Sequence, residues 1–226
     1  MEAREGAVAA IDEKTVFTAP RSDHDAELTV RRSRFIGSVR TALTVEAANE
    51  LIKGLPSLFP KASSYCWAYR VGQDEHCSDG GEPSGTAGRP ILGVIRRHGL
   101  DNTLVAVTRY FGGVKLGVRG LIDAFGAAAE AAVSEAGAAE MEYYNRLELA
   151  CGYDFSKTLA TTLRKWGFGE ERQNAVYGAE VSLSVEVPCS MRAEIEPELA
   201  EMKARGFLTK LAWCEKNEVF ERFRKK

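Results

Sequence analysis

The sequence predicts an α+β protein with two domains that meet near residue 140. Beyond Tyr144, the patterns of strand, helix, strand, strand, helix and strand follow one another, which is the βαββαβ order of a ferredoxin-like domain. The preceding part follows a different order and contains two glycine-rich loops, so a boundary is expected between Gly137 and Tyr144. We expect a flexible tail over residues 1–14, an N-terminal domain over 15–139 and the ferredoxin-like domain over 140–226.

The first elements follow from local patterns. The segment "ELTVRRSRFIGSV" alternates and contains β-branched residues, which predicts a pair of strands around residues 31–34. The segment "TVEAANELIKGL" places its apolar residues on one helical stripe, with Thr44 as the N-cap and Pro56 at the end. The segment "SSYCWAYRV" predicts a strand with three aromatic residues on one face, namely Tyr65, Trp67 and Tyr69. Such a ladder can stack nucleic-acid bases, but packing within the fold is favoured.

The later elements of the first domain flank the glycine-rich loops. Pro90 is placed to open the helix "PILGVIRRHG", which Gly99 ends. The segment "NTLVAVTRYF" predicts an apolar strand, and "LIDAFGAAAEAAVSEAG" predicts a helix with one buried stripe. In the second domain we expect strands in "RLELACGY", "GEERQNAVYG", "AEVSLSVEV" and "TKLAWCEKNEV", and helices in "SKTLATTLRKWG" and "MRAEIEPELAEMKARG".

The composition is that of a globular protein. Of 226 residues, 45% are hydrophobic and 27% charged, and the formal net charge of −2 excludes a wholly basic nucleic-acid binder but not a local basic face. No apolar run reaches the roughly 20 residues of a membrane-spanning helix, and the N-terminus lacks a secretory pattern, so we expect a cytoplasmic protein without a membrane partner. Five cysteines without a CxxC spacing and three scattered histidines predict reduced thiols and no metal site.

Two glycine-rich loops are the most unusual segments of the chain. They are "SDGGEPSGTAGRP" at residues 78–90 and "GGVKLGVRG" at residues 112–120, and each runs into a predicted helix. Free amides at a helix start favour anions, and residues 89–119 contain six basic residues against one acid. Neither loop matches the phosphate-binding GxxxxGK[ST] or the dinucleotide-binding GxGxxG pattern. An anion site and a set of tight turns beside a solvated basic face both remain open.

Several side chains in and around these loops are candidates for chemistry. Asp79 and Glu82 could form an acid–base pair, although carboxylates in glycine loops more often bond to backbone amides. Arg109 ends a buried strand on the same side as Val105 and Val107, where it needs an anionic partner or water. Arg119 lies four residues before Asp123, so these two residues can form a surface ion pair.

The motifs "SDGGEPSGTAGRP" and "VTRYFGGVKLGVRGL", with "RSRFIG" and "CWAYR" upstream, resemble the signature of the YigZ/IMPACT family over roughly residues 15–135. The resemblance implies a ribosomal protein S five domain 2-like N-terminal domain and a ferredoxin-like C-terminal domain, a pair similar to the fourth and fifth domains of elongation factor G. It also implies a link to translation, which eukaryotic members regulate through protein contacts. Two departures from the family pattern are the sequence from Ser63 to Tyr65, where a histidine is frequent, and Gly80, where a second aspartate is frequent.

The combined interpretation is a translation-related regulator, not an enzyme and without a cofactor. It would bind RNA phosphates or a ribosome-associated partner through a basic cleft between the two glycine loops, with no DNA specificity. The anion-binding residues would be Arg89, Arg109, Gly112, Gly113, Lys115, Gly117 and Arg119, and the loop-forming residues would be Gly81, Pro83, Gly85, Thr86 and Gly88. The alternatives are an enzyme that uses Asp79 and Glu82 on a small phosphorylated or carboxylated substrate, and a domain that only binds other proteins.

Overall fold

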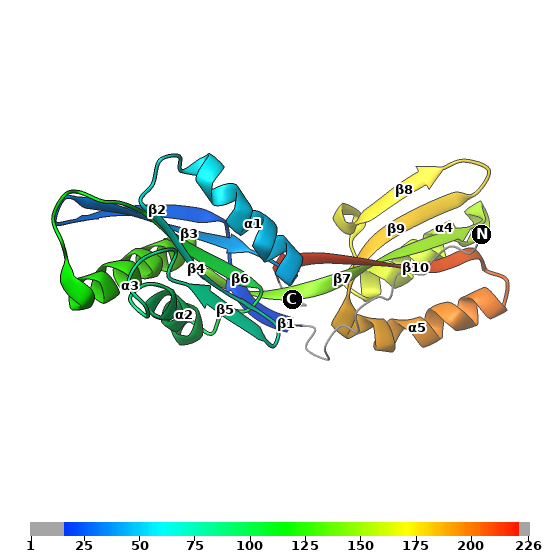
Figure 1. Ribbon diagram of the computed structural model, residues 1–226. Coiled ribbons are helices and arrows are strands. Elements are labelled where there is room, and N and C mark those ends of the chain that lie inside the picture. The colour runs from blue at the N-terminus through cyan, green and yellow to red at the C-terminus, as the bar shows by residue number, and fades with distance from the viewer. Residues whose placement is uncertain (1–15, 222–226) are drawn as a thin grey trace, which may run out of the picture. The chain divides into compact units, whose positions relative to one another are not determined.

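The computed structural model describes residues 16–221, which form two compact units with a boundary after Glu140 (Figure 1). The described residues contain two five-stranded sheets and five α-helices, so the chain is a mixed α and β protein as expected. The tail expected over residues 1–14 lies outside the described residues. No helix within residues 16–221 has both the length and the apolar character needed to cross a membrane.

The sheet of the first unit has the strand order β2-β3-β6-β4-β5, and all neighbouring strands are antiparallel. Its strands are β2 (His24–Val30), β3 (Ser33–Thr41), β4 (Ser64–Val71), β5 (Asp74–Ser78) and β6 (Thr103–Tyr110). The central strand β6 is buried over Thr103–Arg109 because both faces of the sheet are covered by helices. An additional strand, β1 (Val16–Pro20), pairs with a strand of the second sheet. The sequence patterns did not predict β1 or β5.

The predicted strand pair around residues 31–34 is confirmed as the β2–β3 hairpin. Its two turn residues, Arg31 and Arg32, have φ values of 43° and 70°. Positive φ at both central positions is the geometry of the tight turn that matches the twist of the strands, a turn for which Asn-Gly is the usual sequence. Both arginines are exposed, and they occupy two positions whose positive φ favours glycine or asparagine.

Helices cover the two faces of this sheet separately (Figure 1). Helices α2 (Gly88–Arg97) and α3 (Gly117–Ala136) pack against the face that carries Phe35, Val105 and Val107. Helix α1 (Val45–Leu58) packs against the opposite face, which carries Tyr69 and Leu104. Arg109 has the same parity as Val105 and Val107 along β6, and it therefore points toward the side of α2 and α3.

Helix boundaries agree only in part with the predicted signals. Thr44 caps α1 as predicted, since its Oγ1 accepts a hydrogen bond from the Ala47 amide over 3.1 Å. Pro56 does not end α1, because it lies in the last turn, where the helix closes with a bond from the Phe59 amide to the Leu55 carbonyl. Pro90 is the third residue of α2 and not the first, because a carboxylate from the preceding loop bonds the amides of Ala87 and Gly88.

The second unit follows the predicted order of strand, helix, strand, strand, helix and strand. Its elements are β7 (Ala138–Cys151), α4 (Tyr153–Lys165), a short 3-10 turn (Glu170–Arg172), β8 (Gln173–Tyr177), β9 (Val181–Pro188), α5 (Cys189–Ala204) and β10 (Leu208–Glu221). The strand order is β10-β7-β9-β8 with antiparallel neighbours, and β1 also pairs with β7. One core joins both helices to the sheet through residues such as Leu147, Leu163 and Leu199. The region between Gly137 and Tyr144 was expected as a break in the pattern, but most of it is continuous with β7.

The close approach of α3 to the sheet depends on Gly37. A Cβ at this position would lie 2.1 Å from the backbone oxygen of Ala128, and the clash involves backbone that cannot rotate away. We expect Gly37→Ala to lower the free energy of unfolding by about 1–3 kcal/mol through overpacking. Urea unfolding followed by circular dichroism measures this loss.

The matched control is Gly54→Ala, because a Cβ at Gly54 in α1 meets no atom within 4 Å. Alanine is the better helix former, so this variant should be as stable as the wild type or more stable by up to about 1 kcal/mol. Equal stability of both variants would show that helix α3 does not rest on Gly37 as described.

Candidate functional site

A buried ion pair joins the first glycine-rich loop to the end of β6. Nη1 of Arg109 lies 2.7 Å from Oε2 and 2.9 Å from Oε1 of Glu82, and only 8% and 9% of the two side chains are exposed. Removing both charges from water is costly, and the pair is tolerable because each charge neutralises the other and further polar groups contact both. Arg109 thus has its partner within the chain, which is the structural alternative left open by the sequence.

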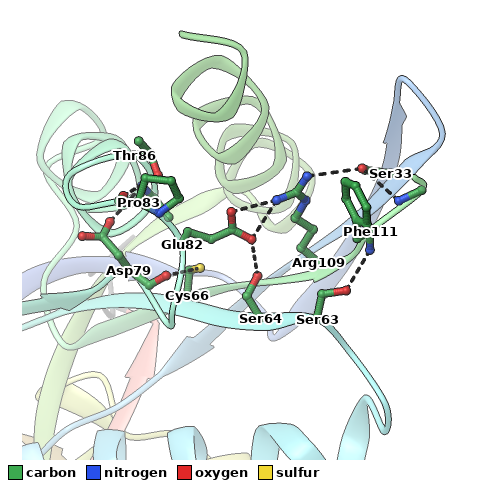
Figure 2. A network of polar contacts seen from close by, with 12 residues as sticks. Ser33, Ser63, Ser64, Cys66, Asp79, Glu82, Pro83, Thr86, Arg109 and Phe111 are labelled. Carbon is green, nitrogen blue, oxygen red and sulfur yellow. Dashed lines mark hydrogen bonds and ion pairs between the residues drawn. The ribbon is translucent and has the colours of Figure 1, made fainter. Parts of the chain in front are cut away.

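The groups around this pair position it (Figure 2), while the buried Nε of Arg109 has no hydrogen-bond partner among the described residues. The Ser64 hydroxyl donates a hydrogen bond of 2.7 Å to Oε1 of Glu82, and Nη2 of Arg109 lies 3.5 Å from the Ser33 hydroxyl. The guanidinium of Arg109 also lies between two aromatic rings, 5.5 Å from the centroid of Phe35 and 5.3 Å from that of Phe111. The pair therefore connects β3, β4, β6 and the loop in one contiguous network.

Asp79 organises the first glycine-rich loop. Its carboxylate accepts hydrogen bonds from the amides of Gly85, Ala87 and Gly88 over 2.8–2.9 Å, the last two at the start of α2. Burial alone would raise the pKa of Asp79, but these three bonds and the nearby charge of Arg89 outweigh it and lower the pKa. The carboxylate consequently stabilises the fold above its ordinary titration range, and this stabilisation is lost as the pH falls through the lowered pKa.

The remaining residues of this loop make turns. The Pro83 carbonyl accepts from both the amide and the hydroxyl of Thr86, and Gly81 and Gly85 have positive φ. Gly80, the departure from the family pattern, has a φ of 56°, and a Cβ there would lie 2.1 Å from the Tyr65 carbonyl oxygen. An aspartate at this position would require the backbone to shift.

Cys66 lies beside the network and is an apolar, protonated group. It is fully buried, and its thiol donates to the Asp79 carbonyl over 3.0 Å. Burial raises the pKa of the Cys66 thiol to about 12, so it does not form the thiolate that nucleophilic chemistry needs. All five cysteines are free in the structure. Within residues 16–221 no group of three or more potential metal-ligating side chains converges.

The second glycine-rich loop lies directly against the β2–β3 hairpin. A Cβ on Gly112 would stand 1.9 Å from the Arg32 carbonyl oxygen, and the Gly112 amide donates to the Ser33 hydroxyl over 3.2 Å. Gly113 and Gly117 have positive φ, and α3 then starts without a side-chain cap. The backbone of the loop therefore lies against the hairpin turn that carries the exposed Arg31 and Arg32, and the exposed Lys115 follows three residues after Gly112.

The predicted cations are thus not equivalent. Arg109 is buried and paired, whereas Arg89 and Lys115 are exposed. Arg119 is also exposed and pairs with Asp123 over 3.2 Å, as its spacing predicted. No hydrogen bond or ion pair of the side chains of Arg31, Arg32 or Lys115 occurs in the described part of the chain. The sequence interpretation missed Arg31 and Arg32 because only the pairing of β3 with β6, and no local motif, brings their turn to the loop.

The predicted aromatic ladder is not an exposed stacking surface. Trp67 and Tyr69 stack on each other with ring centroids 5.8 Å apart, and both pack against the core beneath α1. The Tyr65 hydroxyl donates to the Phe59 carbonyl over 2.6 Å. Packing within the fold, the favoured alternative, is confirmed.

Removing one partner of the buried pair should destabilise the first unit strongly. We expect Arg109→Ala to lower the free energy of unfolding by about 3–5 kcal/mol, because the Glu82 carboxylate is left buried without its partner. A double variant that replaces both Arg109 and Glu82 with leucine should lose less than the sum of the two single variants. Urea unfolding of the full chain measures all three.

The control is Arg119→Ala, which breaks an ion pair whose arginine is 87% exposed and should leave stability unchanged. If Arg109→Ala were as well tolerated as Arg119→Ala, the buried pair would not hold the site together.

Comparison with known proteins places these features in a family. The Impact N-terminal domain model matches residues 31–133, which contain both glycine-rich loops and the ion pair. The chain is 34% identical over 145 residues to IMPACT family member YvyE of Bacillus subtilis (strain 168), which covers 63% of this chain and 67% of that protein. It is 30% identical over 188 residues to IMPACT family member YigZ of Escherichia coli (strain K12), which covers 81% and 91% respectively.

A solved structure, the crystal structure of a hypothetical protein, is also similar. It shares 28% identity and a TM-score of 0.60 over 90% of this chain and 99% of that chain, so the likeness extends through both units. On the strength of the two curated relatives, the chain belongs to the IMPACT family.

Proposed function

We propose that the protein is a translation-related regulator that binds RNA phosphates through a basic surface formed by the β2–β3 hairpin and the second glycine-rich loop. The basic surface is defined by Arg31, Arg32, Lys115 and the first turn of α3 with Arg119. Membership of the IMPACT family supports the link to translation, which the sequence motifs had implied. The observation that carries RNA binding is the close approach of Gly112 to the backbone carbonyl of Arg32, because it sets side by side two distant segments that each contain exposed cations.

The electrostatics of this surface favour a phosphate chain over a single buried anion. Arg31, Arg32 and Lys115 are exposed, and the described residues provide no carboxylate partner for them. Exposed cations of this kind bind phosphates by releasing counterions, and the amides at the start of α3 add donors, because no side chain caps that helix. The net charge of −2 provides no general attraction for RNA, so the attraction has to come from a local basic face such as this one.

The start of α2 and Arg109 contribute to this proposal differently from the initial expectation. The amides of Ala87 and Gly88 are bonded to Asp79, and Arg109 is paired with Glu82. These groups are therefore proposed to support the basic surface from beneath rather than to contact RNA. The same contacts argue against a reaction at Asp79 and Glu82, whose carboxylates are engaged by backbone amides, an arginine and a serine.

We also propose that the two units are a ribosomal protein S five domain 2-like domain and a ferredoxin-like domain. The βαββαβ order and the strand order β10-β7-β9-β8 support the second assignment. The resemblance of the sequence motifs supports the first.

The RNA-binding proposal is tested by removing two cations without disturbing the fold. We expect Arg32→Asn with Lys115→Ala to weaken binding of a labelled RNA oligonucleotide and to reduce the salt dependence of log K by about 0.7–1 per lost phosphate contact. Asparagine is chosen because it tolerates the positive φ of position 32. Fluorescence anisotropy over a range of salt concentrations measures both quantities.

Lys53→Ala is the control, because Lys53 is an exposed cation on α1 that pairs with Glu50 and is not part of the basic surface. It should leave the affinity and the salt slope unchanged. An unaltered slope in the double variant would remove this surface as the RNA site, and it would favour a domain that only binds other proteins.

The domain assignment is tested with a fragment of residues 138–226, which begins at the start of β7. We expect the fragment to fold alone, because one core joins β7–β10 with α4 and α5. A dispersed amide NMR spectrum is the expected result. A collapsed spectrum, with the full chain dispersed, would show that these residues do not form an independent domain.

A further inference from the structure

We propose that Phe111 is a base-stacking platform, and that the ligand of the basic surface is single-stranded RNA with at least one unstacked base. This inference rests on the proposed function and names the form of RNA that the same surface takes. Phe111 follows β6 directly, and half of its surface is exposed, in contrast to the buried aromatic residues of this unit such as Phe35 and Phe125. A single exposed aromatic residue is ordinary on a protein surface, so the role of Phe111 depends on the groups around it.

Phe111 is held in place from beneath and from its backbone. The guanidinium of Arg109 lies 5.3 Å from its ring centroid, and that guanidinium is itself fixed by Glu82. The Phe111 amide donates to the Ser63 hydroxyl over 2.9 Å, and the next amide, of Gly112, donates to Ser33. Figure 2 shows the ring beside Arg109, with the Ser63 contact at its backbone. A ring held in this way loses little conformational entropy on binding.

The surroundings of the ring indicate a nucleic acid with exposed bases. The backbone carbonyl of Arg32 lies against Gly112, which is the residue after Phe111. The exposed Lys115 follows in the same loop. Aromatic rings between cations are the combination that binds single strands, since bases stack on the rings while phosphates meet the cations. A duplex hides the faces of its bases and offers nothing to the ring.

A protein partner is the competing occupant for an exposed aromatic residue. A protein contact of this kind is centred on an apolar patch that excludes water. Next to Phe111 in the chain are instead Gly112 and Gly113, with the backbone of Arg32 against Gly112, and the next exposed apolar residue along the chain is Val118 in the first turn of α3. The chemistry next to the ring therefore favours a base over a protein side chain.

The test compares single-stranded and duplex RNA of one sequence on the full chain. We expect Phe111→Ala to weaken binding of the single-stranded oligonucleotide about 5- to 100-fold, which corresponds to one stacked base. The salt slope should not change, because no phosphate contact is lost. Phe111→Trp should keep the affinity, and binding of inorganic polyphosphate should be the same for the wild type and Phe111→Ala. A 2-aminopurine base in the oligonucleotide should lose fluorescence on binding to the wild type but not to Phe111→Ala.

Tyr177→Ala is the matched control, because Tyr177 is an aromatic residue with 70% exposure on β8, outside the basic surface. Thermal unfolding of each variant establishes that it is folded. If Phe111→Ala binds RNA as the wild type does, or if duplex and single strand bind equally, the stacking proposal is overturned. The basic surface would then be tested only by the variant at Arg32 and Lys115, and the exposed ring would be assigned to a protein contact. If the wild type binds no RNA, both proposals fail.

Discussion

The architecture around the glycine-rich loops depends on the ion pair between Arg109 and Glu82. An arginine at the end of a buried strand would be costly without a counter-charge, and the loop supplies that charge from 27 residues earlier in the chain. The pair holds the loop against β6 while the Ser64 hydroxyl anchors Glu82. One electrostatic contact therefore ties the loop that precedes α2 to the strand that precedes the second glycine loop. The positions of the two glycine-rich segments therefore depend on each other through this pair of side chains.

The carboxylates of the first loop show how a motif with the composition of an active site can serve the fold. The Asp79 carboxylate occupies the position at the start of α2 where a bound anion could otherwise accept hydrogen bonds. Its three amide partners are therefore satisfied within the chain. Cys66 is kept protonated by burial, and Thr86 bonds to its own loop. Glycine at positions 80 and 88 permits the close packing that these bonds require, since a Cβ would meet backbone at 2.1 Å and 3.0 Å respectively. In the second loop, by contrast, the exposed Lys115 has no hydrogen-bond or ion-pair partner among the described residues.

The sequence was sufficient to predict the elements with strong periodicity. The strands around Arg109, the stripe of α3 and the βαββαβ order of the second unit all follow from patterns within short windows. It was not sufficient for β1 and β5, whose five-residue strands are too short for a pattern to emerge. For Arg109 the sequence predicted only the need for an anionic partner or water. It did not identify Glu82, because local spacing does not reveal which distant carboxylate lies near the end of a strand. The approach of Arg32 to Gly112, on which the proposed basic surface depends, follows from the pairing of β3 with β6, which no local pattern reveals. Likewise, the exposed aromatic residue is Phe111 and not the alternating ladder of β4, because exposure depends on where α1 packs.

The turn of the β2–β3 hairpin has a consequence for how this chain can change. Arg31 and Arg32 adopt the left-handed conformation, which costs an ordinary side chain roughly 1 kcal/mol relative to glycine or asparagine. A search for more stable sequences would therefore select Asn-Gly at this turn and would discard two cations in the same step. Under the proposed function, thermostability and ligand affinity are opposed at these two positions.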